Sequence, residues 1–170
     1  MNAGAPLPPQ TPGPAYGFVE WFRPGEHARA EAAVAGMRAA GASFLRTHIS
    51  WAEYHAPGGE AWYDWLIPYL GERIDLLPCV HYTPPSLSRT GAASGPPRRL
   101  RDYADFCDHV LTRYGRHFSH VELWNEPNNL LDWDWREDSD WLLFCEMAGA
   151  AAHWIGERGW KAVLGGPCPF

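Results

Sequence analysis

The chain has 170 residues, the length of one domain that can bury a substantial core. Its apolar content of 46% and charged content of 20% are typical of globular proteins and argue against disorder. The formal net charge of -6 gives no electrostatic basis for binding nucleic acid or an anionic membrane, and no apolar run is long enough to cross a bilayer.

The first residues, 1–15, are rich in proline, glycine and alanine and carry neither the charged nor the apolar region of a signal peptide. We interpret them as a flexible leader, followed by a single domain over residues 16–170. The 4 cysteines form no CxxC pair, which favours reduced thiols. Together these features predict a cytoplasmic protein.

Short β-rich runs alternate with longer amphipathic stretches along the rest of the chain. The predicted strands cover residues 16–21, 44–49, 76–82, 120–124 and 162–164. Four helices lie between them, beginning near residues 24, 62, 100 and 139 and ending near residues 41, 73, 114 and 159. We expect Pro68 to kink or shorten the second helix and Ser139 to cap the fourth.

This alternation predicts an α/β protein with a parallel sheet, which is either an open doubly wound sheet or a barrel. No GxGxxG turn follows the first strand, which disfavours a dinucleotide-binding fold. A complete barrel takes roughly 250 residues for eight units, or about 31 each, so the roughly 155 residues after the leader hold about five units. We therefore predict a partial (β/α)8 TIM barrel with about five β-strands and four intervening helices.

The segment Val-Glu-Leu-Trp-Asn-Glu-Pro-Asn, residues 121–128, carries the clearest chemical signal. Pro127 disfavours the helical region for Glu126, so we expect Glu126 to be extended and to project from the strand end, which is the active-site end in a barrel. A carboxyl held partly out of water keeps its proton to higher pH, as a general acid requires. Asn125 adds a donor and an acceptor for a sugar hydroxyl. The alternatives are a solvated loop carboxylate and a turn-forming asparagine.

Trp-Asn-Glu-Pro at the end of the fourth strand resembles the acid/base signature of the retaining glycosidases of clan A. The run over residues 122–128 is most similar to glycoside hydrolase family 39, which holds β-xylosidases and α-L-iduronidases, and Leu-Gly-Gly-Pro at 164–167 also resembles that family. The resemblance implies that Glu126 is the general acid/base and that Asn125 binds the hydroxyl next to the reacting carbon. Arg46 and His81 match polar positions that line the sugar pocket in the wider clan.

The retaining mechanism requires a second carboxylate, about 5–5.5 Å from the first, as the nucleophile. In the family this residue is a glutamate on the seventh strand, and residues 1–170 include no such strand. We therefore expect hydrolysis of O-glycosidic bonds, with a β-xyloside as the substrate implied by the resemblance, and with the nucleophile missing from this chain. No cofactor is implied, and no metal, since HExxH is absent.

Several other residues have two interpretations. Arg46 either supports the active site or pairs with a carboxylate inside the barrel, and His81 either lines the pocket or is a core histidine. Three tryptophans near the predicted loops are expected either to stack on sugar rings or to pack against the barrel, namely Trp51, Trp133 and Trp135. The charged run 136–138 is expected on the solvated surface.

A rival hypothesis is a non-catalytic carbohydrate-binding or assembly module that retains half a barrel, and a third is an inactive truncated product. In a five-stranded sheet the edges of the first and last strands are exposed, and such edges favour pairing with another strand. Beyond a carbohydrate substrate, the expected partner is therefore a second copy of the chain or a completing C-terminal half.

Overall fold

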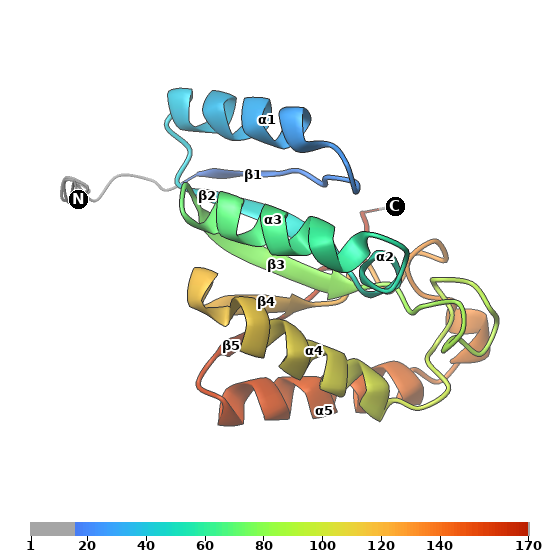
Figure 1. Cartoon of the computed structure of the whole chain (residues 1–170). Coiled ribbons are helices and arrows are strands. Elements are labelled where there is room, and N and C mark those ends of the chain that lie inside the picture. Colours follow the sequence, from blue (N-terminus) through green and yellow to red (C-terminus); the bar gives the residue numbers. More distant parts are fainter. Residues whose placement is uncertain (1–15, 170) are drawn as a thin grey trace.

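The computed structural model describes residues 16–169, which form one parallel five-stranded sheet (Figure 1). The strands are β1 (Gly17–Val19), β2 (Phe44–Ser50), β3 (Asp75–His81), β4 (His120–Leu123) and β5 (Lys161–Leu164). All four neighbouring pairs are parallel, which confirms the predicted number and direction of the strands. The predicted leader, residues 1–15, lies outside the described residues.

The helices occupy the intervals between the strands. They are α1 (His27–Ala39), α2 (Trp51–Tyr54), α3 (Gly59–Gly71), α4 (Arg101–Tyr114) and α5 (Leu142–Glu157), with 3-10 turns η1 (Gly115–His117) and η2 (Trp135–Glu137). The four long helices were predicted. The short α2 was not, because four residues are too few to show a periodicity. It begins where the Ser50 hydroxyl accepts a hydrogen bond from the Glu53 amide at 3.1 Å. Pro68 does not interrupt α3, which continues to Gly71.

The order of the strands decides between the two α/β architectures. It is β1-β2-β3-β4-β5, the order of the chain, whereas a doubly wound sheet reverses direction at a switch point. Successive helices also contact one another: Arg113 on α4 binds Asp64 on α3 at 2.6 Å, and Arg158 after α5 pairs with Asp108 on α4. Figure 1 shows the long helices following one another along the sheet. The fold is therefore a segment of a (β/α)8 barrel, as predicted.

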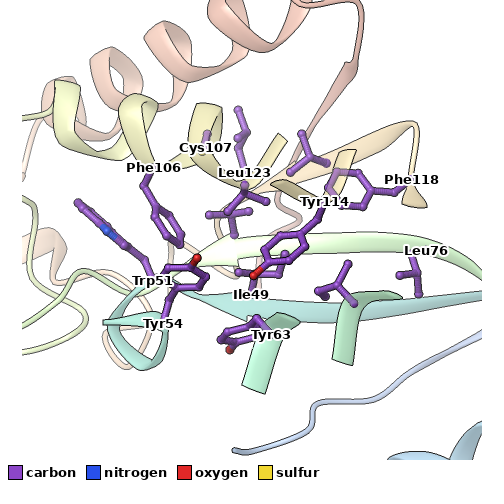
Figure 2. Close-up of a cluster of buried hydrophobic side chains, with 14 of the residues drawn as sticks. Ile49, Trp51, Tyr54, Tyr63, Leu76, Phe106, Cys107, Tyr114, Phe118 and Leu123 are labelled. Carbon is purple, nitrogen blue, oxygen red and sulfur yellow. The ribbon is translucent and has the colours of Figure 1, made fainter. Parts of the chain in front are cut away.

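The core between the sheet and the helices is rich in aromatic side chains (Figure 2). Trp51 stacks on Phe106 with ring centroids 5.5 Å apart, and Tyr54 stacks on Tyr63 at 5.9 Å. Burial of each large apolar side chain stabilises the fold by about 1.5–3 kcal/mol. This packing fixes α2, α3 and α4 against the central strands and so holds the carboxyl ends of those strands in place.

The beginning of α5 differs from the prediction. The Ser139 side chain does not cap it. Instead the carboxylate of Asp138, only 2% exposed, accepts hydrogen bonds from the amides of Leu143 and Phe144, both at 2.9 Å, and from the Trp133 indole at 3.2 Å. A carboxylate satisfies two free helix amides at once and is favoured at the positive end of the helix dipole. The prediction of a solvated run over 136–138 is thus wrong for Asp138.

The outer strands β1 and β5 are the least buried part of the sheet. Val19 is 58% exposed and Leu164 is 66% exposed. None of the helices between residues 16 and 169 is both long and apolar enough to cross a membrane.

Candidate active site

Four of the predicted site residues come from β2, from the carboxyl end of β3 and from the loop after β4. Parallel strands end at the same side of a sheet, so side chains from distant parts of the chain meet there. Arg46 comes from β2, His81 ends β3, and Asn125 and Glu126 follow β4 directly.

Arg46 forms a two-pronged ion pair with Glu122 inside the sheet. Its Nε donates to Oε2 at 2.5 Å and its Nη2 donates to Oε1 at 2.8 Å. The side chains are 19% and 6% exposed, and the hydrogen bond to Glu122 raises the pKa of Arg46. Pairing with a carboxylate inside the barrel was one of the two interpretations of Arg46, and this pair confirms it. Sequence reasoning did not single out Glu122, although a charge in the apolar strand β4 was a signal for a buried partner.

The ion pair extends into the loop after β4. Arg46 Nη2 also donates to Asn125 Oδ1 at 2.8 Å, and Asn125 Nδ2 donates to Asp132 Oδ1 at 2.9 Å. Burial raises the pKa of Asp132, while hydrogen bonds from Asn125 and Tyr82 oppose that rise. Asp132 was not predicted, because a contact made by a folded loop leaves no periodic signal in the sequence.

Glu126 is half-buried beside this network, and its charge acts on Arg46, Tyr82 and Asp132. Its backbone has φ 32°, and Trp124 has φ 68°. The prediction that Glu126 is extended is therefore wrong: Pro127 excludes the right-handed helical region but leaves the left-handed one open. Such conformations cost about 1–3 kcal/mol each in non-glycine residues and persist only where the surroundings enforce them.

The segment after β5 supplies part of that support. A Cβ atom at Gly165 would lie 2.2 Å from the backbone oxygen of Trp124, so only glycine allows this approach. Asn128 and Cys168 exchange two hydrogen bonds, from Nδ2 to the Cys168 carbonyl at 3.1 Å and from the Cys168 amide to Oδ1 at 2.7 Å. The two segments that carry the family resemblance are therefore direct neighbours in space.

His81 is buried behind the network and has no exposed area. Its Nε2 lies 3.3 Å from Nδ1 of His48, whose Nε2 lies 3.1 Å from the Phe22 carbonyl oxygen. Desolvation lowers the pKa of both histidines, that of His81 strongly. The structure thus corrects the direct sugar contact predicted for His81 and favours the alternative of a core histidine, next to the site.

The tryptophans predicted to stack on sugars divide into two groups. Trp133 is fully buried, with its ring edge-on to Trp124 at 5.2 Å and to Phe144 at 5.3 Å between centroids, and Trp51 is 1% exposed. Both indoles are almost completely buried, which favours the alternative interpretation for Trp51 and Trp133, packing against the barrel. Trp135 is 38% exposed and retains a face that a ring could cover.

Two cavities flank the central strands. The larger, about 860 Å³, lies outside the sheet between the α2–α3 region and α4, and does not include Glu126. A second cavity of about 470 Å³ lies at the carboxyl-end side of β1, β2 and β3, with Trp21, His48 and Tyr82 in its lining. Its lining does not include Glu126 either, but Tyr82, which borders it, follows His81 at the carboxyl end of β3.

The fold and the site together define an α/β protein of the barrel class with a carboxylic acid at the carboxyl end of its fourth strand. No family model and no curated protein matches the chain. The chain is similar to a solved structure of a family 39 glycoside hydrolase from the gut symbiont Bacteroides cellulosilyticus WH2, with a TM-score of 0.56 and 14% sequence identity. The match covers 88% of this chain and 32% of that one. At this identity the likeness establishes the shared fold.

Proposed function

We propose that this chain provides the acid/base side of a retaining glycosidase active site, with Glu126 as the proton donor. The observation that carries the proposal is the position of Glu126, half-buried at the carboxyl end of β4 and in reach of the Arg46–Asn125–Asp132 network. The fold shared with a family 39 glycoside hydrolase supports it.

In the first step Glu126 gives its proton to the glycosidic oxygen as the bond from that oxygen to the anomeric carbon breaks. In the second step the Glu126 carboxylate takes a proton from the water that displaces the sugar from the enzyme. Asn125 donates one Nδ2 hydrogen to a sugar hydroxyl. A β-xyloside is the proposed substrate, and the chemistry of these residues requires no cofactor.

The nucleophilic carboxylate of this proposal comes from outside residues 16–169. The two acids of the network already have partners: Glu122 accepts both hydrogen bonds of the ion pair with Arg46, and Asp132 accepts one from Asn125. We propose that the nucleophile arrives on a segment that pairs with the exposed edge of β5, either from a longer chain or from a second copy. Sedimentation of the purified chain tests the second source, which predicts a dimer.

A second candidate function is carbohydrate binding without cleavage. The exposed face of Trp135 favours it, because indole faces stack on the apolar faces of sugars. It predicts that glycosides bind the chain without being hydrolysed and that Trp135→Ala weakens this binding.

Hydrolysis of aryl β-xylosides separates the two when the wild type and Glu126→Gln are compared in the form that supplies the nucleophile, the dimer or the longer chain. General acid catalysis contributes about 10²–10⁴-fold, so we expect a loss of that size in Glu126→Gln. Glu137→Gln, in the exposed η2 turn, is the matched control and retains wild-type turnover. Turnover that survives Glu126→Gln contradicts the glycosidase assignment. Binding without turnover in the wild type supports the second candidate.

A further inference from the structure

The amide of Asn125 is held on both sides by charged groups of opposite sign. Arg46 Nη2 lies 2.8 Å from Oδ1, and Asp132 Oδ1 lies 2.9 Å from Nδ2. A guanidinium group only donates and an ionised carboxylate only accepts. Rotating the amide by half a turn would therefore face donor with donor and acceptor with acceptor. The two contacts allow a single orientation.

Asp132 is itself fixed in the loop. Its backbone carbonyl accepts the Trp124 indole hydrogen at 2.9 Å, and its amide donates to the Asn129 carbonyl at 2.9 Å. Its side chain is 6% exposed, and Trp124 has no exposed area. Asp132 thus belongs to the rigid part of the site, and its contact with Asn125 joins two positions of the loop after β4.

The histidines behind Asp132 donate no hydrogen bond to its Oδ1, which therefore accepts from Asn125 alone among these neighbours. The Phe22 carbonyl only accepts, so the neutral His48 carries its hydrogen on Nε2 and presents a bare Nδ1 to His81. His81 then donates from Nε2, and its Nδ1, 3.9 Å from Asp132 Oδ1, carries no hydrogen. His81 Nδ1 is accordingly a buried atom without a hydrogen-bond partner within residues 16–169.

We propose that Asp132 is a positioning residue, which together with Arg46 sets the amide of Asn125 so that one Nδ2 hydrogen remains to donate to a sugar hydroxyl. This role rests on the proposed function and deepens it, since it leaves Asn125 a hydrogen to donate to the substrate. Besides Asn125 and His81, the titratable and charged groups near Asp132 are Tyr82, Glu126, Arg46 and the thiols of Cys79 and Cys168.

The test is the side-chain amide signal of Asn125 in nitrogen–proton correlation spectra of the full chain, assigned by its loss in Asn125→Asp. We expect its hydrogens to exchange with water about tenfold faster in Asp132→Leu than in the wild type, because the charged acceptor is lost. Asp132→Asn restores most of the protection, since its amide oxygen still accepts. Asp134→Asn, in the same loop but paired with Arg136, is the control and leaves the signal unchanged.

Unchanged exchange in a folded Asp132→Leu variant overturns the proposal. If that variant does not fold, the wild-type chain still decides: a scalar coupling across the hydrogen bond from Asn125 Nδ2 to Asp132 Cγ is expected, and amide hydrogens that exchange as fast as in a free asparagine overturn the role. Neither measurement needs a substrate, so the positioning role can be tested even if the glycosidase assignment fails.

A kinetic experiment tests the consequence for the substrate by comparing aryl β-xylosides with and without the hydroxyl next to the reacting carbon. Asp132→Leu is expected to reduce the wild-type preference for the hydroxyl about tenfold, and Asp132→Asn to restore it.

Discussion

Two arginine–carboxylate pairs in this molecule share a two-pronged geometry but lie in different surroundings. Arg46 and Glu122 meet inside the sheet with side chains 19% and 6% exposed, whereas Arg113 and Asp64 join α4 to α3 on the outside with 39% and 38% exposed. The outer pair has water as an alternative partner for each charge. The inner pair is largely shielded from solvent, and Arg46 also donates a hydrogen bond to Asn125. Similar bonds therefore fasten two helices in one region and organise a reactive site in the other.

The largest expected difference between the two regions is in the cost of removing the arginine. Arg46→Met leaves Glu122 buried without its counter-charge and is expected to lower the free energy of unfolding by about 3–5 kcal/mol. Arg113→Met is expected to lower it by about 0–1 kcal/mol, as for exposed pairs. Urea unfolding of both variants measures the contrast. Replacing Glu122 with leucine in the Arg46→Met background should recover much of the loss, and equal losses in the two single variants would contradict the comparison.

A smaller effect is expected at Asp138, a buried carboxylate whose hydrogen-bond donors are backbone amides and an indole. Asp138→Ala removes the acceptor at the beginning of α5 and should cost about 1–2 kcal/mol in urea unfolding. Ser139→Ala, one residue along, removes the side chain that the sequence suggested as the cap and should cost close to nothing. If Ser139→Ala is the more damaging change, the cap has been assigned to the wrong residue.

The smallest expected effects are opposite pH dependences of stability at the two sites. Burial raises the pKa of Asp132 above its ordinary value of 3.8, so the folded state favours the protonated side chain. The stability that this preference contributes is fully present below pH 3.8 and is lost as the pH rises through the folded-state pKa. The hydrogen bond from Arg113 lowers the pKa of Asp64, so its contribution is present above 3.8 and is lost as the pH falls.

Urea unfolding midpoints from about pH 3 to about pH 6 measure both slopes. Asp132→Asn is expected to remove the decline on raising the pH, and Asp64→Asn the decline on lowering it. If the two substitutions change the slope of the urea midpoint against pH in the same direction, the inner and outer acids experience similar surroundings and the comparison is contradicted.

The architecture followed from the sequence because its signals are local. Apolar strand runs and helical periodicities placed all five strands and the four long helices, and only the order of the strands in space separated the barrel from the doubly wound sheet. The short helix α2 and the cap at Asp138 escaped prediction, because each depends on one or two hydrogen bonds rather than on a repeating pattern.

The site was predictable only in part, for a different reason. Glu126 and Asn125 were found from a short motif at a strand end, and Arg46 from its resemblance to a polar position of the wider clan. Whether an aromatic side chain is free to stack on a sugar or packs into the core depends on how the loop folds. The sequence therefore left both interpretations open for Trp133, which is fully buried. Asp132 joins the site through the same folding of the loop.

The most direct test of the central claim, that Glu126 donates a proton to the departing oxygen, is the dependence of cleavage on the leaving group. Turnover of aryl β-xylosides is measured for the wild type, Glu126→Gln and the control Glu137→Gln, each in the form that supplies the nucleophile, the dimer or the longer chain. The account predicts that Glu126→Gln loses about 10²–10⁴-fold with unsubstituted phenyl, which leaves poorly without a proton, and far less with dinitrophenyl, which leaves without one. Equal losses for both leaving groups would contradict the role of Glu126 as the acid.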